Sequence, residues 1–194
     1  MPTLTHRPAH VAAKARQPGD PALAARLAKA IEGEVLFGPF DRGRHATDAS
    51  LYQIEPLGVI RPRTKADIEA AIAIARKEGV SLIARGGGTS QAGQTVGRSV
   101  VVDNARWLTG MSGLDREAGT VWVEPGLVLD ELNRALKVHG LFYPVDVSTA
   151  SRATLGGMTA NNSCGSRSLR YGVSVDNVLA IEAVTAAGET MVFG

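Results

Sequence analysis

The stretch ARGGGTSQAGQ, at residues 84–94, places three consecutive glycines between two apolar runs. Glycines leave their backbone N–H groups unobstructed, and a run of such groups can form a concave nest that binds an anion. The hydroxyls of Thr89 and Ser90, which follow the glycines, add two donors. This combination favours a diphosphate as the ligand.

Other glycine-rich loops have signatures that this stretch lacks. A P-loop needs a lysine and a hydroxyl residue after its last glycine, but Gly88 is followed by Thr-Ser-Gln. A Rossmann fingerprint needs a glycine at its sixth position and a helix after it. Gln91 stands at that position, and Gly93 and Gly97 oppose a helix. A tight turn between strands stays open as an alternative, although a turn rarely needs three glycines in succession.

A second stretch, PVDVSTASRATLGGMTANNSCGSRSLRYG at residues 144–172, mixes glycine with serine, threonine and asparagine. It lacks the apolar period of a core element and predicts a long loop. Small residues let the backbone approach a flat polar ligand, while hydroxyls and amides bind its edge atoms. A surface loop without a ligand is the alternative. Together, the two stretches indicate a dinucleotide cofactor held by loops.

The elements that must hold these loops begin with an amphipathic helix over residues 20–34, for which Asp20 is the predicted N-cap. Residues 37–56 show no period and predict an irregular connection. Residues 57–86 are typical of a strand, a helix and a second strand, and residues 99–105 of a third buried strand. Such strands, joined by a crossover helix, predict a small parallel sheet.

The helix within residues 57–86 has its own start signal. Thr64 is the predicted N-cap, and Asp67 occupies the acidic position of a capping box three residues later.

The pattern changes in the second half of the chain. Residues 111–126 alternate around a turn and predict a hairpin, residues 127–140 predict an amphipathic helix, and residues 177–194 predict a second hairpin. We therefore expect an α+β fold, in which a small parallel α/β subdomain is followed by an antiparallel-sheet subdomain.

Composition excludes several classes of function. The formal net charge of +2, with no basic stripe, argues against a nucleic-acid partner. A single cysteine, Cys164, excludes an internal disulfide and a cysteine-rich metal site, and the four histidines, His6, His10, His45 and His139, show no ligand spacing. Each histidine is expected to be solvated or to cap a helix. No secretory signal or membrane span is present, so we expect a cytoplasmic protein with a flexible N-terminal arm.

Six sequence blocks in this order carry a family resemblance: VIRPRTKADIEAAIAIA, ARGGGTSQAGQ, VVVDNARWL, VEPGLVLDELNRAL, ATLGGMTANNSCG and RYG. They resemble the FAD-binding domain of the vanillyl-alcohol oxidase and p-cresol methylhydroxylase superfamily. Within it, the chain is similar to FAD-linked dehydrogenases of D-2-hydroxy acids: glycolate oxidase flavin subunits, D-lactate dehydrogenases and D-2-hydroxyglutarate dehydrogenases. The resemblance covers about residues 35–194. We expect an N-terminal arm at residues 1–50, with a short helix and an irregular connection, and an FAD-binding domain at 51–194. That domain is expected to be truncated at its C-terminus.

The resemblance also implies which residues bind FAD. In the first loop, which binds the pyrophosphate in the family, they are Arg85, Gly86, Gly87, Gly88, Thr89, Ser90, Gln91, Gly93 and Gln94. In the second, which lies along the flavin and ribityl parts, they are Asp146, Thr154, Gly156, Gly157, Asn161, Ser163, Gly165 and Tyr171. FAD is expected to be non-covalent, because Thr89 stands where members that tether the cofactor have a histidine.

The resemblance implies a reaction that this chain cannot complete. The family continues into a substrate domain, so we expect no catalytic residue and no metal ligand among these residues. The full-length protein is expected to take a small hydroxy acid, with a redox partner or an iron–sulfur cluster in a missing C-terminal part. The alternative is a non-catalytic flavin- or nucleotide-binding module or an electron-transfer subunit.

Three residues before the first strand, and the cysteine, give further expectations. Asp48 and Ser50 are expected to form local turn bonds and Tyr52 to contribute a packed ring, with contact to the flavin as the alternative. Cys164 is expected to be a small apolar filler.

Overall fold

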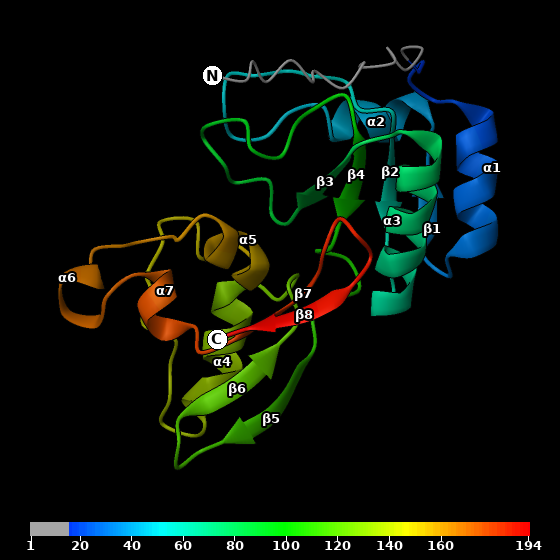
Figure 1. Cartoon of the computed structure of the whole chain (residues 1–194). Coiled ribbons are helices and arrows are strands. Elements are labelled where there is room, and N and C mark those ends of the chain that lie inside the picture. The colour runs from blue at the N-terminus through cyan, green and yellow to red at the C-terminus, as the bar shows by residue number, and fades with distance from the viewer. Residues whose placement is uncertain (1–15) are drawn as a thin grey trace, which may run out of the picture.

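The structure is a computed structural model that describes residues 16–194, so the expected flexible arm lies outside the described residues over positions 1–15. The helices are α1 (Pro21–Ala30), α2 (Pro39–Arg44), α3 (Lys65–Glu78), α4 (Leu129–Lys137), α5 (Leu155–Ala160), α6 (Ser168–Tyr171) and α7 (Ser174–Asn177). The strands are β1 (Glu34–Leu36), β2 (Gly58–Arg61), β3 (Leu82–Arg85), β4 (Val100–Asp103), β5 (Met111–Asp115), β6 (Thr120–Val123), β7 (Ile181–Val184) and β8 (Thr190–Phe193). Figure 1 shows two regions: α1 to β4 form the upper one, and β5 to β8 with α4 to α7 form the lower one.

The upper region is a four-stranded sheet with strand order β1-β2-β4-β3. β2, β3 and β4 run parallel, and β1 pairs antiparallel with β2 at the edge. α1 and α3 cover one face, where Leu27 and Ala71 meet Ile60 in a single core. Val59 and Val101 point to the opposite face and are also completely buried. Burial on both faces explains why these strands are continuous apolar runs.

The helix start signals predicted from the sequence are present, with one change. Asp20 caps α1 through its side chain, and the Thr64 hydroxyl accepts a hydrogen bond from the Asp67 N–H at 3.3 Å. The Asp67 carboxylate does not complete a capping box. Instead it accepts hydrogen bonds from the N–H groups of Arg63 and Glu32, each at 2.8 Å. The buried carboxylate therefore ties the start of α3 to the chain that follows α1.

The stretch at residues 37–56 is not irregular throughout, because Pro39–Arg44 form α2. Proline is common at the first position of a helix. The helix was missed because its residues show no apolar period. β1 was not predicted at all, and its three residues are too few to show a period. α1 and β1 pack in the same core as the rest of the upper sheet. The domain boundary predicted at residue 50 would therefore divide one core, and it stays a prediction.

The lower region has a second core beneath β5 and β6. Leu129, Leu132 and Leu136 of α4 are buried, as the spacing predicted, and Val121 and Val123 of β6 pack against them. The antiparallel part consists of two separate two-stranded sheets, β5-β6 and β7-β8. Both hairpins lie where the sequence predicted them, and the α+β fold with two regions is confirmed.

Residues 144–172 are only partly a loop, because α5 and α6 lie within them. α5 begins at Thr154, whose side chain caps the Gly157 N–H, and it buries Leu155 and Met158 on one side. Two apolar residues three positions apart suffice for such a short helix. The pair of glycines between them concealed the pattern, because glycine is unfavourable inside helices.

The β7–β8 hairpin is held mainly against α3. Lys65 Nζ lies 2.7 Å from Glu182 Oε1, and Arg76 donates a hydrogen bond to the Ala187 carbonyl. Large apolar side chains of this hairpin, including Phe193, stay exposed.

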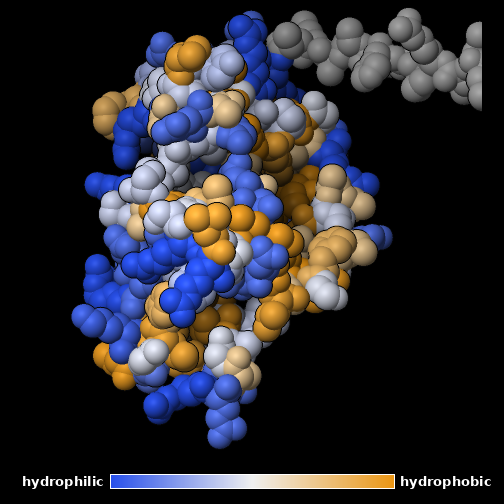
Figure 2. Space-filling view, turned by 90° about the vertical axis from the view of Figure 1, so that its left-hand side faces the viewer, coloured by the Kyte–Doolittle hydropathy of each residue, from blue (hydrophilic) through white to orange (hydrophobic). Residues whose placement is uncertain are grey.

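Figure 2, which views the left-hand side of Figure 1, shows hydrophobic residues gathered toward one side of that face. None of the described helices has the length and apolarity needed to cross a lipid bilayer.

A buried ionic network joins β1, β2, β4 and the end of α2. Arg61 Nε donates to Asp103 Oδ2 at 3.0 Å, and Arg61 also pairs with Glu34 at 3.1 Å. His45 Nε2 lies 3.3 Å from the same Asp103 oxygen, while its Nδ1 lies 2.8 Å from the Asp41 carbonyl oxygen. His45 thus caps α2, as one of its two predicted roles, but it is buried and not solvated.

Burial alone would raise the pKa of Asp103. Hydrogen bonds from His45 and Arg61 outweigh it and hold the pKa below its usual value. Asp103 is therefore ionised in the folded protein at neutral pH, and its charge stabilises the sheet.

We expect Asp103→Asn to lower the free energy of unfolding by about 2–3 kcal/mol at neutral pH, because it leaves Arg61 partly buried with Glu34 as its remaining carboxylate partner. The pKa of Asp103 is lower in the folded than in the unfolded protein, so its ionised carboxylate contributes to the free energy of unfolding above the unfolded-state pKa of about 3.9. This contribution is lost as the pH falls through the lower folded-state pKa. Urea unfolding at a series of pH values measures this. The control is Glu182→Gln, which breaks a half-exposed pair and should cost below about 1 kcal/mol. Equal losses in the two variants would contradict the role given to Asp103.

Candidate functional site

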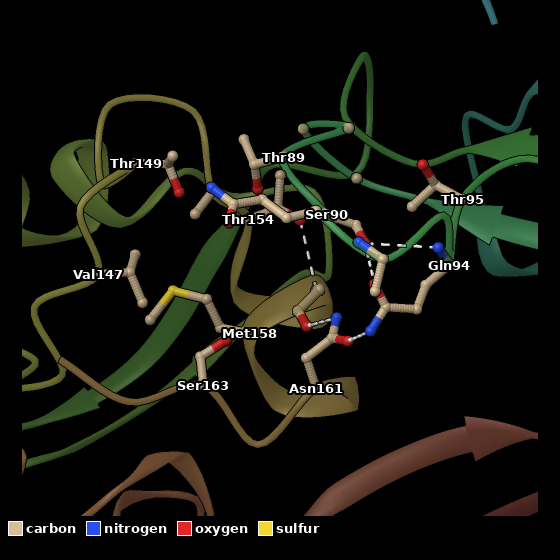
Figure 3. A pocket seen from close by; sticks show the side chains of 17 residues that line it. Thr89, Ser90, Gln94, Thr95, Val147, Thr149, Thr154, Met158, Asn161 and Ser163 are labelled. Atoms are coloured by element: carbon tan, nitrogen blue, oxygen red, sulfur yellow. Dashed lines mark hydrogen bonds between the residues drawn. The ribbon is translucent and has the colours of Figure 1, made fainter. Parts of the chain in front are cut away.

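The two glycine-rich stretches meet at one cavity of 270 Å³, between the end of β3 and the start of α5. The cavity lies where the upper and lower regions face each other (Figures 1 and 3). Its lining residues are Gly86, Gly87, Gly88, Thr89, Ser90, Gln91, Ala92, Gln94, Thr95, Val147, Thr149, Ala153, Thr154, Gly157, Met158, Asn161 and Ser163.

Close backbone contact between the two stretches requires glycine at two positions. A Cβ on Gly87 would collide with the backbone carbonyl of Arg152, and a Cβ on Gly86 with the Thr154 hydroxyl. The backbone of the first loop therefore lies directly against the chain that enters α5. The sequence predicted a ligand or a tight turn for these glycines, whereas the structure gives Gly86 and Gly87 a packing role as well.

The third glycine is needed for its backbone conformation. Gly88 has φ +65°, in the left-handed region that favours glycine. The guanidinium of Arg85 lies beside it, where a Cβ on Gly88 would be. Arg85 turns away from the cavity, donates to the Thr47 carbonyl at 2.8 Å and has a pKa lowered by burial.

Five consecutive backbone N–H groups at this loop have no acceptor. Within residues 16–194, none of the N–H groups of residues 86–90 donates a hydrogen bond, although these residues line the cavity. Backbone N–H groups that lack a protein partner bind water or a ligand. Such a row, here called the anion nest, has the unpaired donors that the sequence prediction requires. That it binds an anion stays a prediction.

Among residues 16–194, no charged side chain lines the cavity. Met158 and Val147 form an apolar wall, and hydroxyl and amide groups provide the polar atoms. Figure 3 shows the side chains of Gln94 and Asn161 meeting from the two stretches, with the Gln94 amide donating to Asn161 Oδ1 at 2.7 Å. The site can therefore bind an anion through neutral donors, but its lining contains no acid, base or cationic clamp.

The structure brings most of the predicted site residues together. Those that line the cavity are Gly86, Gly87, Gly88, Thr89, Ser90, Gln91, Gln94, Thr154, Gly157, Asn161 and Ser163. Those that lie outside its lining are Arg85, Gly93, Asp146, Gly156, Gly165 and Tyr171.

The predicted residues outside the lining have structural contacts of their own. Asp146 accepts hydrogen bonds from the Ser166 hydroxyl at 2.6 Å and the Arg167 N–H at 2.8 Å, and these bonds lower its pKa. Gly156 lies against Pro125, and Tyr171 stacks edge-on with Phe142. Contact of these residues with a cofactor stays a prediction.

Sequence reasoning missed some lining residues: Ala92, Thr95, Val147, Thr149, Ala153 and Met158. All lie inside the two quoted stretches or directly beside them. Val147 and Met158 gave no separate signal, because an apolar residue in a polar segment is ordinarily a core contact.

The remaining expectations have mixed outcomes. Asp48 and Ser50 form the predicted turn bonds, with the Ser50 N–H donating to Asp48 at 2.9 Å. The ring of Tyr52 lies against Gly93 but is 51% exposed, so it is only partly packed. Cys164 is exposed, so its prediction as an apolar filler is wrong. Among the described residues, no cluster of histidine, cysteine or acidic side chains could hold a metal ion.

Comparison with known proteins gives one family. Residues 56–194 match the family model described as an FAD binding domain. A D-2-hydroxyglutarate dehydrogenase of Haemophilus influenzae is 39% identical over 83% of this chain and 16% of its own length. The glycolate oxidase subunit GlcD of Bacillus subtilis is 34% identical over 82% of this chain and 35% of its own length.

Solved structures agree on the fold. An alkyldihydroxyacetonephosphate synthase superposes with a TM-score of 0.81 at 24% identity, covering 90% of this chain and 35% of that one. The wild-type BBE-like 1 protein of Physcomitrella patens superposes with a TM-score of 0.73 at 25% identity, covering 88% and 37%. The chain thus spans 16–37% of the proteins compared here. The match over residues 56–194 confirms the resemblance found in the sequence: this chain belongs to the FAD binding domain family.

Proposed function

We propose that this chain binds FAD non-covalently, with the diphosphate on the N–H groups of residues 86–90. The observation that carries the proposal is the row of five unpaired N–H groups in a cavity without charged side chains. Backbone N–H groups can bind the oxygen atoms of a phosphate, and no carboxylate among the described lining residues repels it.

The cavity fits part of the cofactor. Its volume of 270 Å³ is at the lower limit for a drug-sized ligand, about 300 Å³, so a dinucleotide would extend beyond it. Met158 and Val147 would contact an apolar ring face, and Gln94, Asn161 and Thr154 would present hydrogen-bonding groups beside it. FAD, when bound, supplies the hydride acceptor. The residues of this chain bind it, orient it and exclude water from one side.

We further propose that the whole protein is an FAD-dependent oxidoreductase that oxidises the CH–OH group of a D-2-hydroxy acid. The names of the relatives, D-2-hydroxyglutarate dehydrogenase and glycolate oxidase subunit, support this class of substrate. They favour it over a non-catalytic module, which none of these names describes. A base and a carboxylate clamp are absent from the cavity lining, so we assign no catalytic residue. An iron–sulfur cluster and a redox partner stay predictions.

Thr89→Asp should weaken FAD binding by at least about 100-fold. A carboxylate placed in the nest would lie close to the diphosphate, and like charges about 4 Å apart repel by roughly 4 kcal/mol at an effective dielectric constant near 20. Titration calorimetry of the chain with FAD measures the effect. The matched control is Thr89→Asn, which has similar size without the charge and should stay within about tenfold of wild type. FAD affinity that is equal in the two variants would place the diphosphate elsewhere.

Bound flavin should be released by acid. Among the described residues, the cavity lining contains no histidine, cysteine or tyrosine, the side chains expected to form a covalent bond to the flavin, and Cys164 lies outside it. Acid precipitation of the yellow complex should leave the colour in the supernatant. Flavin fluorescence that travels with the protein band on a denaturing gel would contradict this.

The 194-residue chain supplied with FAD should not reduce a dye in the presence of D-lactate, glycolate or D-2-hydroxyglutarate. Hydride removal needs the α-carbon held against the flavin and a base within hydrogen-bond reach of the hydroxyl, and the lining offers no base. Dye reduction that depends on the D-enantiomer and survives repurification would overturn this expectation. Buffer with free FAD is the blank.

A further inference from the structure

Residues 46–54, here called the 46–54 loop, form a closed loop beside the glycine loop, taken here as residues 85–95 and so including Arg85, the last residue of β3. The Ile54 N–H donates to the Ala46 carbonyl at 2.8 Å, and Thr47 and Gln53 form an antiparallel bridge. The loop emerges directly after His45, which the buried network with Asp103 fixes in place. None of its residues lines the cavity.

Three hydrogen bonds join this loop to the glycine loop at separate points. The Ala49 N–H donates to the Gly88 carbonyl at 3.1 Å, and the Thr95 hydroxyl donates to Asp48 Oδ2 at 3.1 Å. The third runs from the Arg85 guanidinium to the Thr47 carbonyl at 2.8 Å. The beginning, middle and end of the glycine loop are therefore all held from the same neighbour.

Asp48 joins the two loops through a single carboxylate. Its Oδ1 accepts from the Ser50 N–H within its own loop, while Oδ2 accepts from Thr95 in the other. Burial alone would raise the pKa of Asp48, but these hydrogen bonds hold it below its usual value. The carboxylate is thus ionised at neutral pH, and both bonds are charge-assisted.

The bond from Ala49 to Gly88 decides where the next N–H points. In a planar trans peptide, the carbonyl oxygen and the N–H of the following residue point in opposite directions. The Gly88 carbonyl is directed toward Ala49, outside the cavity lining. The Thr89 N–H of the same peptide unit must then point away from Ala49, and Thr89 itself lines the cavity.

We infer that the 46–54 loop is a positioning element for the anion nest and that Asp48 is its main positioning residue. The Ala49 N–H of this loop fixes the direction of the Gly88–Thr89 peptide, and the Asp48 carboxylate holds the loop against Thr95. No residue of the loop lines the cavity. The identity of the ligand, FAD, rests on the proposed function. The hydrogen bonds between the two loops do not depend on that function.

The test compares three variants of the 194-residue chain. Asp48→Ala removes both bonds of the carboxylate, whereas Asp48→Asn keeps an acceptor for Ser50 and a hydrogen-bonding group facing Thr95. The matched control is Asp115→Ala in the β5–β6 turn, where Asp115 accepts from the N–H groups of Glu117 at 2.9 Å and Ala118 at 3.0 Å, remote from the glycine loop. Amide hydrogen exchange over residues 46–54 and 86–90 and the FAD dissociation constant are the two measurements.

Asp48→Ala should accelerate exchange of the Ala49 amide and raise the FAD dissociation constant, each by about tenfold, the loss expected for a hydrogen bond to a charged group. Asp48→Asn should recover most of the affinity, and Asp115→Ala should change neither measurement while lowering thermal stability to a similar degree. Faster exchange with unchanged FAD affinity, or no change in either, overturns the positioning role. If the wild-type chain binds no FAD, the proposed function fails; inorganic pyrophosphate then replaces FAD, and the exchange result still decides whether Asp48 holds the loop.

Discussion

The contact between two stretches of bare backbone is the constraint on which the site depends. Gly86 and Gly87 lie so close to residues 152–154 that a single Cβ at either position would overlap with the other segment. The same kind of approach recurs where Gly126 meets the carbonyls of Asn104 and Leu108, at the junction between β4 and the lower region. The upper and lower regions are thus in close contact at glycines, where one segment carries no side chain. The cavity lies beside the first of these contacts.

Charge is distributed so that the cavity stays neutral while its supports are ionic. Asp103, Arg61 and His45 form a network inside the sheet, and Arg85 and Asp48 hold the glycine loop from outside the cavity lining. A cationic side chain in the cavity would attract any anion that diffuses in. A row of fixed N–H dipoles acts over a shorter range, and it binds most tightly a ligand whose oxygen atoms match the spacing of the N–H groups. Selectivity for a diphosphate then depends on how firmly the backbone is held.

The sequence allowed prediction of elements that carry a periodic signal and a recognisable end. The α4 stripe of Leu129, Leu132 and Leu136 and the start of α3 at Thr64 were correct for those physical reasons. β1 and α2 were missed because three to six residues are too few to show a period. β1 is held in place by pairing with β2, and α2 by packing on it. α5 was missed because its glycines argue locally against a helix, while burial of Leu155 and Met158 outweighs that preference. For the site, the residue types indicated an anion ligand, but only the fold distinguishes residues that line the cavity from neighbours such as Asp146, which bind the chain itself.

The double role of the glycines limits what their substitution can reveal. Gly87→Val would be expected to abolish FAD binding whether or not a phosphate lies there, because the added side chain would separate the two stretches at the Arg152 carbonyl. Loss of function at such a position reports on packing and on ligand together. Thr89 lines the cavity one residue beyond the glycines, where a change of charge at constant size separates the two effects. Asp48 supplies the complementary case, since it lies outside the lining and is joined to the glycine loop through the Thr95 hydroxyl.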